Sequence, residues 1–91
     1  MQFAKQLRER VKIGEITCSV RIWKQPRVKV GGRYALPPGE IVVENLFEIA
    51  LEDVTADLAR RSGFEDVTAL LAVAKHGEGE HVFLVEFRYQ E

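Results

Sequence analysis

The sequence has few of the residues that mark disulfide-bonded, metal-binding or membrane proteins. It contains one Cys and two His, so the chain has no internal disulfide, and no Cys/His cluster indicates structural zinc. No apolar run is long enough to span a bilayer, and the first residues lack the apolar core of a secretory signal. We therefore expect a cytoplasmic protein with no metal site, no cofactor and no membrane partner.

Acidic residues are scarce in the first part of the chain. Residues 1–36 hold nine Lys or Arg and two acids, which gives +7, whereas residues 37–91 hold four Lys or Arg and twelve acids, which gives −8. Such segregation indicates a dipolar surface with one region able to attract an anion. The alternative is that the two halves interleave in the fold and neutralise each other.

The residues that are present predict one small globular domain. The 91 residues are 46% hydrophobic and 30% charged, values typical of a soluble domain. Apolar residues at helical spacing predict helices at about 3–13, 56–62 and 66–76. Alternating apolar residues predict strands at about 14–23, 33–36, 40–51 and 81–89. This order predicts an α+β domain over 1–91, with a small antiparallel or barrel-like sheet and two to three short helices.

Residues typical of helix ends separate these elements. Gly14 and Gly63 suit the left-handed position after a helix, and Thr55 and Asp66 suit the N-cap position. Asn45 indicates a bulge or a buried hydrogen bond, because it interrupts an apolar phase of the long strand. That phase comprises Ile41, Val43, Phe47, Ile49 and Leu51.

The stretch 14–23 has the clearest two-faced pattern in the chain. In a strand, successive side chains point to opposite faces. One face then carries the apolar side chains of Ile16, Cys18, Val20 and Ile22. The other carries Thr17, Ser19, Arg21 and Trp23. This second face is either a binding surface or the solvated face of a half-buried strand.

A run rich in basic residues follows, from Arg21 to Arg33. It contains five Lys or Arg and no acid, with Trp23 inside it and Tyr34 directly after it. Basic side chains interleaved with aromatic rings bind phosphates while bases stack on the rings. Alternatively, the two rings belong to the core and the cations keep a loop in solution.

The order of these motifs resembles that of ASCH domains, which belong to the PUA-like superfamily. The matching segments are GEITCSVR at 14–21, VKVGG at 28–32, DVT at 53–55 and LARRSGF at 58–64. The resemblance spans nearly the whole chain, which looks like a small, stand-alone, bacterial-type member of that family. It implies a PUA-like β-barrel with a cleft associated with RNA or modified nucleosides.

Some small members of that family hydrolyse acetylated cytidine with a lysine, a threonine and a glutamate. The resemblance puts these positions on Ile16, Ser19 and the neighbourhood of Ser62, with Glu65 as the nearest acid. A serine hydroxyl needs a neighbouring base to attack at neutral pH, and Ile16 provides none. Arg21 stays protonated, so it is no base, although it can stabilise a phosphate or a developing oxyanion. Ser19 is therefore a weakened catalytic candidate.

Three functions stay open at this point. The sequence favours binding of RNA or a nucleotide in a basic cleft beside the 14–23 strand. The alternatives are a hydrolase of RNA or of a modified nucleoside, and a protein-interaction module that uses the acidic half. The candidate ligand-binding residues are Ser19, Arg21, Trp23, Lys24, Lys29, Arg33, Arg60 and Lys75.

Overall fold

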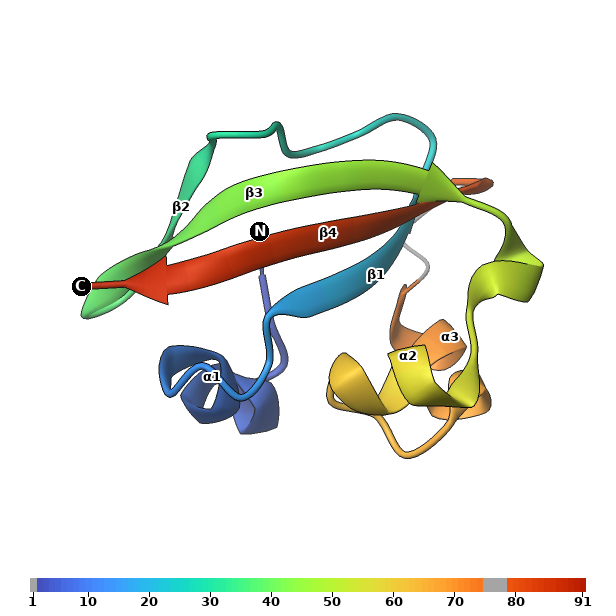
Figure 1. Cartoon of the computed structure of the whole chain (residues 1–91), viewed down its shortest axis with the longest axis horizontal. Helices are drawn as coiled ribbons and strands as arrows, with labels where there is room; N and C mark the ends of the chain where they lie inside the picture. Colours follow the sequence, from blue (N-terminus) through green and yellow to red (C-terminus); the bar gives the residue numbers. More distant parts are fainter. Residues whose placement is uncertain (1, 75–78) are drawn as a thin grey trace.

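The computed structural model describes residues 2–74 and 79–91, which form a curled antiparallel sheet with short helices beneath it (Figure 1). The strands are β1 (Cys18–Trp23), β2 (Arg33–Leu36), β3 (Gly39–Ile49) and β4 (His81–Gln90). They lie in the order β1-β4-β3-β2, and every neighbouring pair is antiparallel. The described helices are α1 (Lys5–Lys12), α2 (Ala56–Arg61), α3 (Val67–Ala74) and the short 3-10 helix η1 (Leu51–Asp53). The predicted α+β class and element order are confirmed.

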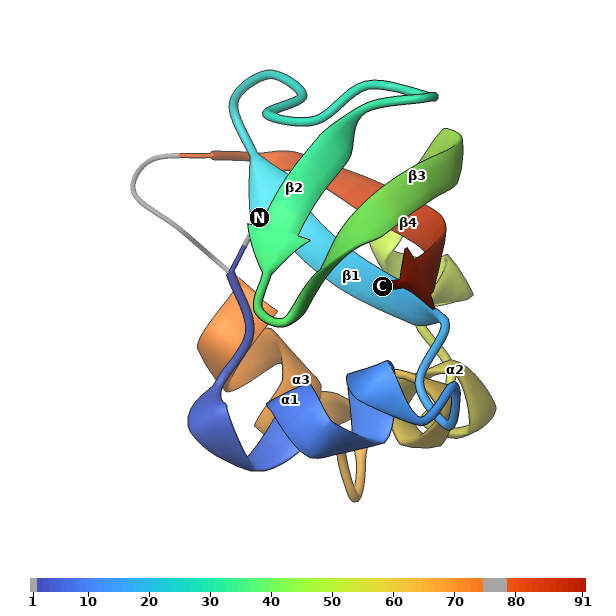
Figure 2. The same cartoon turned by 90° about the vertical axis from the view of Figure 1, so that its left-hand side faces the viewer.

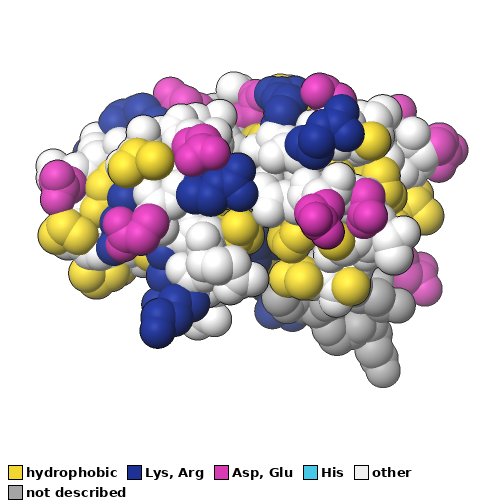
Figure 3. Space-filling model, turned by 90° about the horizontal axis from the view of Figure 1, so that it is seen from below, with side chains coloured by type: hydrophobic (Ala, Val, Ile, Leu, Met, Phe, Trp, Pro, Cys, Tyr) yellow, Lys and Arg dark blue, Asp and Glu magenta, His cyan; other side chains and the backbone are white. Residues whose placement is uncertain are grey.

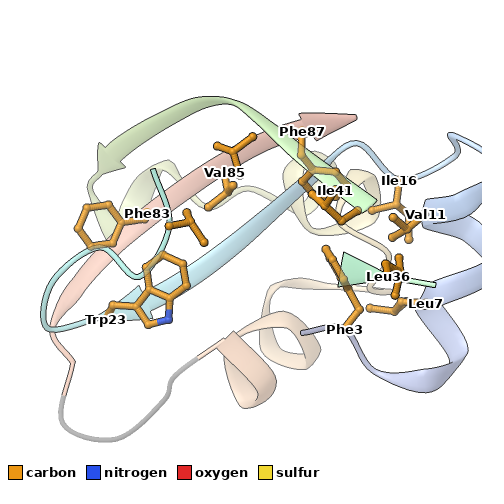
Figure 4. Close-up of a cluster of buried hydrophobic side chains, with 12 residues drawn as sticks. Phe3, Leu7, Val11, Ile16, Trp23, Leu36, Ile41, Phe83, Val85 and Phe87 are labelled. Atoms are coloured by element: carbon orange, nitrogen blue, oxygen red, sulfur yellow. The ribbon is translucent and has the colours of Figure 1, made fainter. Parts of the chain in front are cut away.

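The sheet curls into half a barrel, and α1 lies against its open side (Figure 2). The inner face carries the larger apolar cluster, in which Leu7 of α1 packs with Leu36 of β2. Aromatic rings fill much of this cluster, as Figure 4 shows. The rings of Trp23 and Phe83 lie 5.9 Å apart between centroids, and those of Phe3 and Phe87 lie 5.4 Å apart, edge to face. The inner cluster thus joins the N-terminal segment to all four strands.

A second apolar cluster lies on the other face of β1 and β4, where α2 and α3 cover the sheet. It joins Val20 of β1 and Val82 of β4 to Leu58 of α2 and Leu70 of α3. A strand with apolar side chains buried on both faces is typical of a sheet that lies between two packed layers. Strand β1 is therefore enclosed from two sides.

Polar caps and one glycine set the ends of the helices beneath the sheet. The Thr55 hydroxyl and the Asp66 carboxylate each accept the amide N–H three residues later, at 3.2 and 2.8 Å. Gly63 follows α2 with φ at +97°, and a Cβ added there would lie 2.7 Å from Cδ1 of Ile16. These three predicted helix ends are confirmed. Within the described ranges, no helix is both long enough and apolar enough to cross a bilayer.

A bulge in β3 changes which of its side chains face the half-barrel. Val43 and Asn45 pair with consecutive residues of β4, so Glu44 is the extra residue. The predicted bulge at Asn45 is confirmed. The prediction that Ile41 and Val43 share a phase with Phe47 is wrong, because the bulge shifts the alternation. Leu46 packs against the inner cluster, whereas Phe47 is exposed.

Candidate functional site

A cavity of about 280 Å³ lies between the N-terminal segment with the start of α1, strand β1, the connection from α2 to α3, and the end of α3. Its polar side chains include Ser19, Arg21 and Ser62. Its apolar walls include Phe3, Leu7, Phe64, Val73 and Ala74. Three segments that are far apart in the sequence meet here, because the sheet curls toward α1 while α3 packs beneath β1.

The pairing of β1 with β4 points two predicted site residues into this region. Alternation along β1 places Ser19, Arg21 and Trp23 on one face, and their partners Val85 and Phe83 belong to the inner cluster. The prediction that these three share a face is confirmed. The alternative of a solvated face is wrong, because the curl turns this face into the half-barrel and toward α1.

Arg21 is the main charged group of the cavity. Its Nε donates a hydrogen bond to Oγ of Ser19 at 2.8 Å, and its Nη2 donates to the backbone oxygen of Gln2 at 2.6 Å. Its Cζ lies 5.2 Å from the centre of the Phe3 ring, a cation–π contact. Among residues 2–74 and 79–91, no carboxylate forms an ion pair with it. Desolvation by burial lowers the pKa of Arg21, yet a guanidinium keeps its charge at neutral pH.

Two buried hydroxyls complete the polar side of the cavity. Ser19 is 8% exposed and Ser62 is 3% exposed. The Ser62 Oγ lies 3.6 Å from the Sγ of Cys18. Since Ser19 Oγ accepts from Arg21, its own proton is available to donate to a ligand. The cavity therefore combines a cation with hydroxyl donors, an arrangement suited to an anionic, acceptor-rich group.

Trp23 lies in the core and presents no ring face to a ligand at the surface. It is 3% exposed and packs on Phe83 in the inner cluster. Tyr34 packs against the same cluster, and its hydroxyl accepts the backbone N–H of Lys29 at 3.1 Å. The prediction that Trp23 binds ligand by surface stacking is wrong. The alternative reading, in which both rings belong to the core, is confirmed.

The remaining predicted residues that the structure describes do not line the cavity. Lys24, Lys29 and Arg33 lie on or beside the loop between β1 and β2, which runs over the sheet on the side away from the helices (Figures 1 and 2). Arg60 lies on α2, exposed and outside the lining. Lys75 is outside the described residues. The predicted cleft thus separates into a cavity around Arg21 and a distant group of cations.

The charge of the two halves of the chain is only partly neutralised by ion pairs between them. Within the described residues, one ion pair joins the halves, between Arg33 and Glu40 at 3.5 Å. Other pairs stay within a half, such as Arg88 with Glu44. Seen from the helix side, Lys and Arg side chains alternate with Asp and Glu (Figure 3). That face is mixed in charge, so an anion would be attracted by local groups rather than by the whole face.

The three positions that the ASCH resemblance makes catalytic hold no base. Ile16 is 1% exposed and belongs to the inner cluster, Ser19 is bound to Arg21, and Ser62 is buried beside Cys18. Glu65 is exposed and does not line the cavity. In the described part of the chain, no three His, Cys, Asp or Glu side chains gather where they could hold a metal ion.

Sequence reasoning missed the walls of the cavity. Phe3 fits the helical spacing of the first helix, so the sequence marked it only as a core residue. Phe64 comes directly after Gly63, so the sequence marked it only as part of a motif. Ser62 was assigned to the end of the 56–62 helix, and only the ASCH resemblance gave it a place near a site. No sequence pattern marked the burial of Ser62, because it follows two exposed arginines at the end of α2.

Comparison of the chain with models of known protein families, with curated proteins and with solved structures gave no match. The ASCH resemblance therefore stays a prediction drawn from the motifs, and the functional argument rests on the cavity itself.

Proposed function

We propose that this domain binds RNA or a nucleotide and that Arg21 holds a phosphate group of the ligand. The observation that carries the proposal is a part-buried guanidinium with no carboxylate partner among residues 2–74 and 79–91. Removing a cation from water without a counter-charge costs free energy. A phosphate in the cavity would supply that counter-charge through short, charge-assisted hydrogen bonds.

The other walls of the cavity suit the rest of a nucleotide. The hydroxyls of Ser19 and Ser62 can donate to phosphate, sugar or base oxygens. Phe3, Phe64 and Val73 provide apolar surface for a sugar or a base. A volume of about 280 Å³ is near the lower end of the range for small-molecule pockets. The cavity therefore suits one nucleotide unit, free or at an accessible position of an RNA chain.

The ASCH resemblance supports the same ligand class. The family motif ends on Arg21, and its matched serine, Ser19, accepts a hydrogen bond from that arginine. We accordingly propose an ASCH-type, PUA-like domain that works as a binding module rather than as a hydrolase.

Nuclear magnetic resonance titrations test this proposal. We expect cytidine and uridine monophosphates to shift the backbone amides of residues 19–21 and 62–64. The unphosphorylated nucleosides should bind about tenfold more weakly or worse, because they lack the hydrogen bonds to a charged group. Arg21→Gln removes the charge but keeps polar contacts, so it should reduce monophosphate affinity to that of the nucleoside.

Arg61→Gln is the matched control, since it removes the same charge from an exposed position that does not line the cavity. It should leave the monophosphate affinity unchanged. Equal binding of monophosphate and nucleoside to the wild-type protein, or no shift with either at low salt, would overturn the proposal.

A further inference from the structure

A group of exposed cations lies on the loop that joins β1 to β2, outside the Arg21 cavity. We call residues 24–33 the basic loop. Its cations are Lys24, Arg27, Lys29 and Arg33, all exposed. In the described part of the chain, the first three form no ion pair with a carboxylate. No residue of the basic loop lines the cavity, so this is a separate positive surface.

The basic loop is fixed to the sheet rather than free. Val28 is 6% exposed and is anchored in the inner cluster. The backbone of Val43 on β3 bonds to the loop twice, accepting from Gly31 N–H at 2.7 Å and donating to Gly32 O at 3.0 Å. A backbone held in this way presents its cations at a low cost in ordering entropy.

Nearby carboxylates do not neutralise this surface. Of the acids on the adjoining strand β3, Glu40 pairs with Arg33 and Glu44 pairs with Arg88. Arg33 itself stays 66% exposed in its side chain despite this pair. The three other cations of the loop thus keep their full charge for a partner.

The surface has charge but no exposed aromatic ring. Proteins that bind single strands stack bases on aromatic side chains, and here Trp23 is buried and Tyr34 packs against the core. Val30, 61% exposed, is the one large apolar side chain exposed on the described loop. Such a surface gains the most binding free energy from a partner of high charge density. A nucleic-acid duplex carries twice as many phosphates per unit length as one of its strands.

We propose that the basic loop is a second binding surface, which holds the phosphate backbone of duplex RNA. This inference rests on the proposed function, from which it takes the class of ligand. It adds that the ligand is a duplex and that the basic loop binds it. Contacts to phosphates alone position a protein without reading sequence.

Fluorescence anisotropy with a labelled RNA duplex, at several salt concentrations, tests the inference. Three neutralised phosphates predict a slope of about −2.7 in log affinity against log salt, using the value for duplex DNA. Affinity should fall about 40-fold between roughly 50 and 200 mM salt. The double variant Arg27→Gln, Lys29→Gln should reduce the slope to about −0.9. The matched control, Lys5→Gln with Arg61→Gln, removes two exposed charges on helices and should keep the wild-type slope.

Three competitors complete the test. The single strand of the same sequence and polyglutamate should each bind more weakly than the RNA duplex. A DNA duplex of the same sequence should also bind more weakly, because the fixed loop would meet B-form grooves instead of the A-form grooves of RNA. Tighter binding of the single strand would overturn the choice of a duplex. Equal binding of the DNA duplex would overturn the assignment to RNA, and equal binding of polyglutamate would point to an acidic protein and overturn it too.

The outcomes for the two proposals are separable. Arg21→Gln should keep the salt slope with the duplex while it loses monophosphate binding. A flat salt slope with intact monophosphate binding would overturn the loop surface alone. The expected slope without any monophosphate binding would overturn the cavity and leave the loop surface standing.

Discussion

Arg21 and Trp23 lie two residues apart on the same face of β1, yet their surroundings give them different roles. Trp23 meets Phe83 and the rest of the inner cluster, and it is 3% exposed. Arg21 lies over Phe3 at the edge of the cavity, with its Nη2 bonded to the backbone of Gln2. An apolar ring enclosed by other rings stabilises the fold, whereas a guanidinium without a counter-charge is suited to bind an anion.

Replacement of Trp23 tests this division at the scale of single residues. Trp23→Ala should lower the free energy of unfolding by about 3–5 kcal/mol, through lost burial and the cavity left behind. Urea unfolding followed by circular dichroism measures this loss. Arg27→Ala, an exposed control on the nearby loop, should change stability by about 0.5 kcal/mol or less. A stable Trp23→Ala protein that has lost RNA binding would show instead that the ring is a ligand contact.

At the scale of elements, the sequence predicted those features that depend on residues close to one another in the chain. The start of a helix depends on a hydroxyl or carboxylate that caps an amide three residues later, and its end often depends on a glycine that adopts a positive φ. Thr55, Asp66 and Gly63 were therefore assigned from the sequence alone, and the structure places them as expected. At Asn45, where a polar residue interrupts an apolar alternation, the sequence predicted either a bulge or a buried hydrogen bond, and the structure has the bulge.

The direction in which each face of a strand points was not predictable in the same way. Alternation marked the face with Ser19 and Arg21 as the more polar one, yet in the structure Ser19 is buried on that face. The answer comes from the curl of the sheet and from α3, which packs beneath β1. Ile16 was placed with Cys18 and Val20, yet it precedes β1 and packs in the inner cluster instead. Alternation begins only where the strand begins.

The cap of α2 provides a test at this scale. Thr55→Ala removes the hydroxyl that accepts the Leu58 N–H, and it should cost about 1 kcal/mol of stability. Thr68→Ala makes the same change at an exposed position within α3, where it should be neutral or slightly stabilising because alanine favours helix. Thermal unfolding of the two variants measures the difference. Equal melting temperatures would show that the Thr55 hydroxyl does not cap α2 in solution.

At the scale of the whole molecule, the cavity exists only because distant segments meet. Strand alternation predicted Ser19 and Arg21 as a pair, and the structure joins them by a hydrogen bond. The opposite wall, with Ser62 and Phe64, comes from a segment more than 40 residues later in the chain. No local pattern relates the two, so sequence reasoning placed the polar pair but not the walls that make it a site. The basic loop was grouped with the pair because it follows directly in sequence, although the fold carries it to the other side of the sheet.

The residues that meet in the cavity also bear on whether it can catalyse hydrolysis. Hydrolysis of acetylated cytidine by a serine needs a base that takes the hydroxyl proton. Here Ser19 Oγ accepts from a cation, and the described lining of the cavity contains no Lys, His, Asp or Glu. Arg21 can stabilise an oxyanion but does not accept a proton. Among the described lining residues, Arg21 can hold a developing charge, and none can take the proton of the Ser19 hydroxyl.

We therefore expect the purified protein to bind cytidine ligands without hydrolysing acetylcytidine. Product formation, followed by chromatography over many hours, should equal that of a blank and of the Ser19→Ala variant. Ile16→Lys, which restores a lysine at the matched position, would bury an ammonium in the inner cluster, so we expect it to unfold the domain rather than to create activity. Turnover by the wild-type protein at ordinary enzymatic rates, about 1–1000 per second, would contradict a binding-only role. If that turnover disappeared in Ser19→Ala but persisted in Arg27→Gln, Ser19 would be the nucleophile, and a base from another part of the chain would have to reach it.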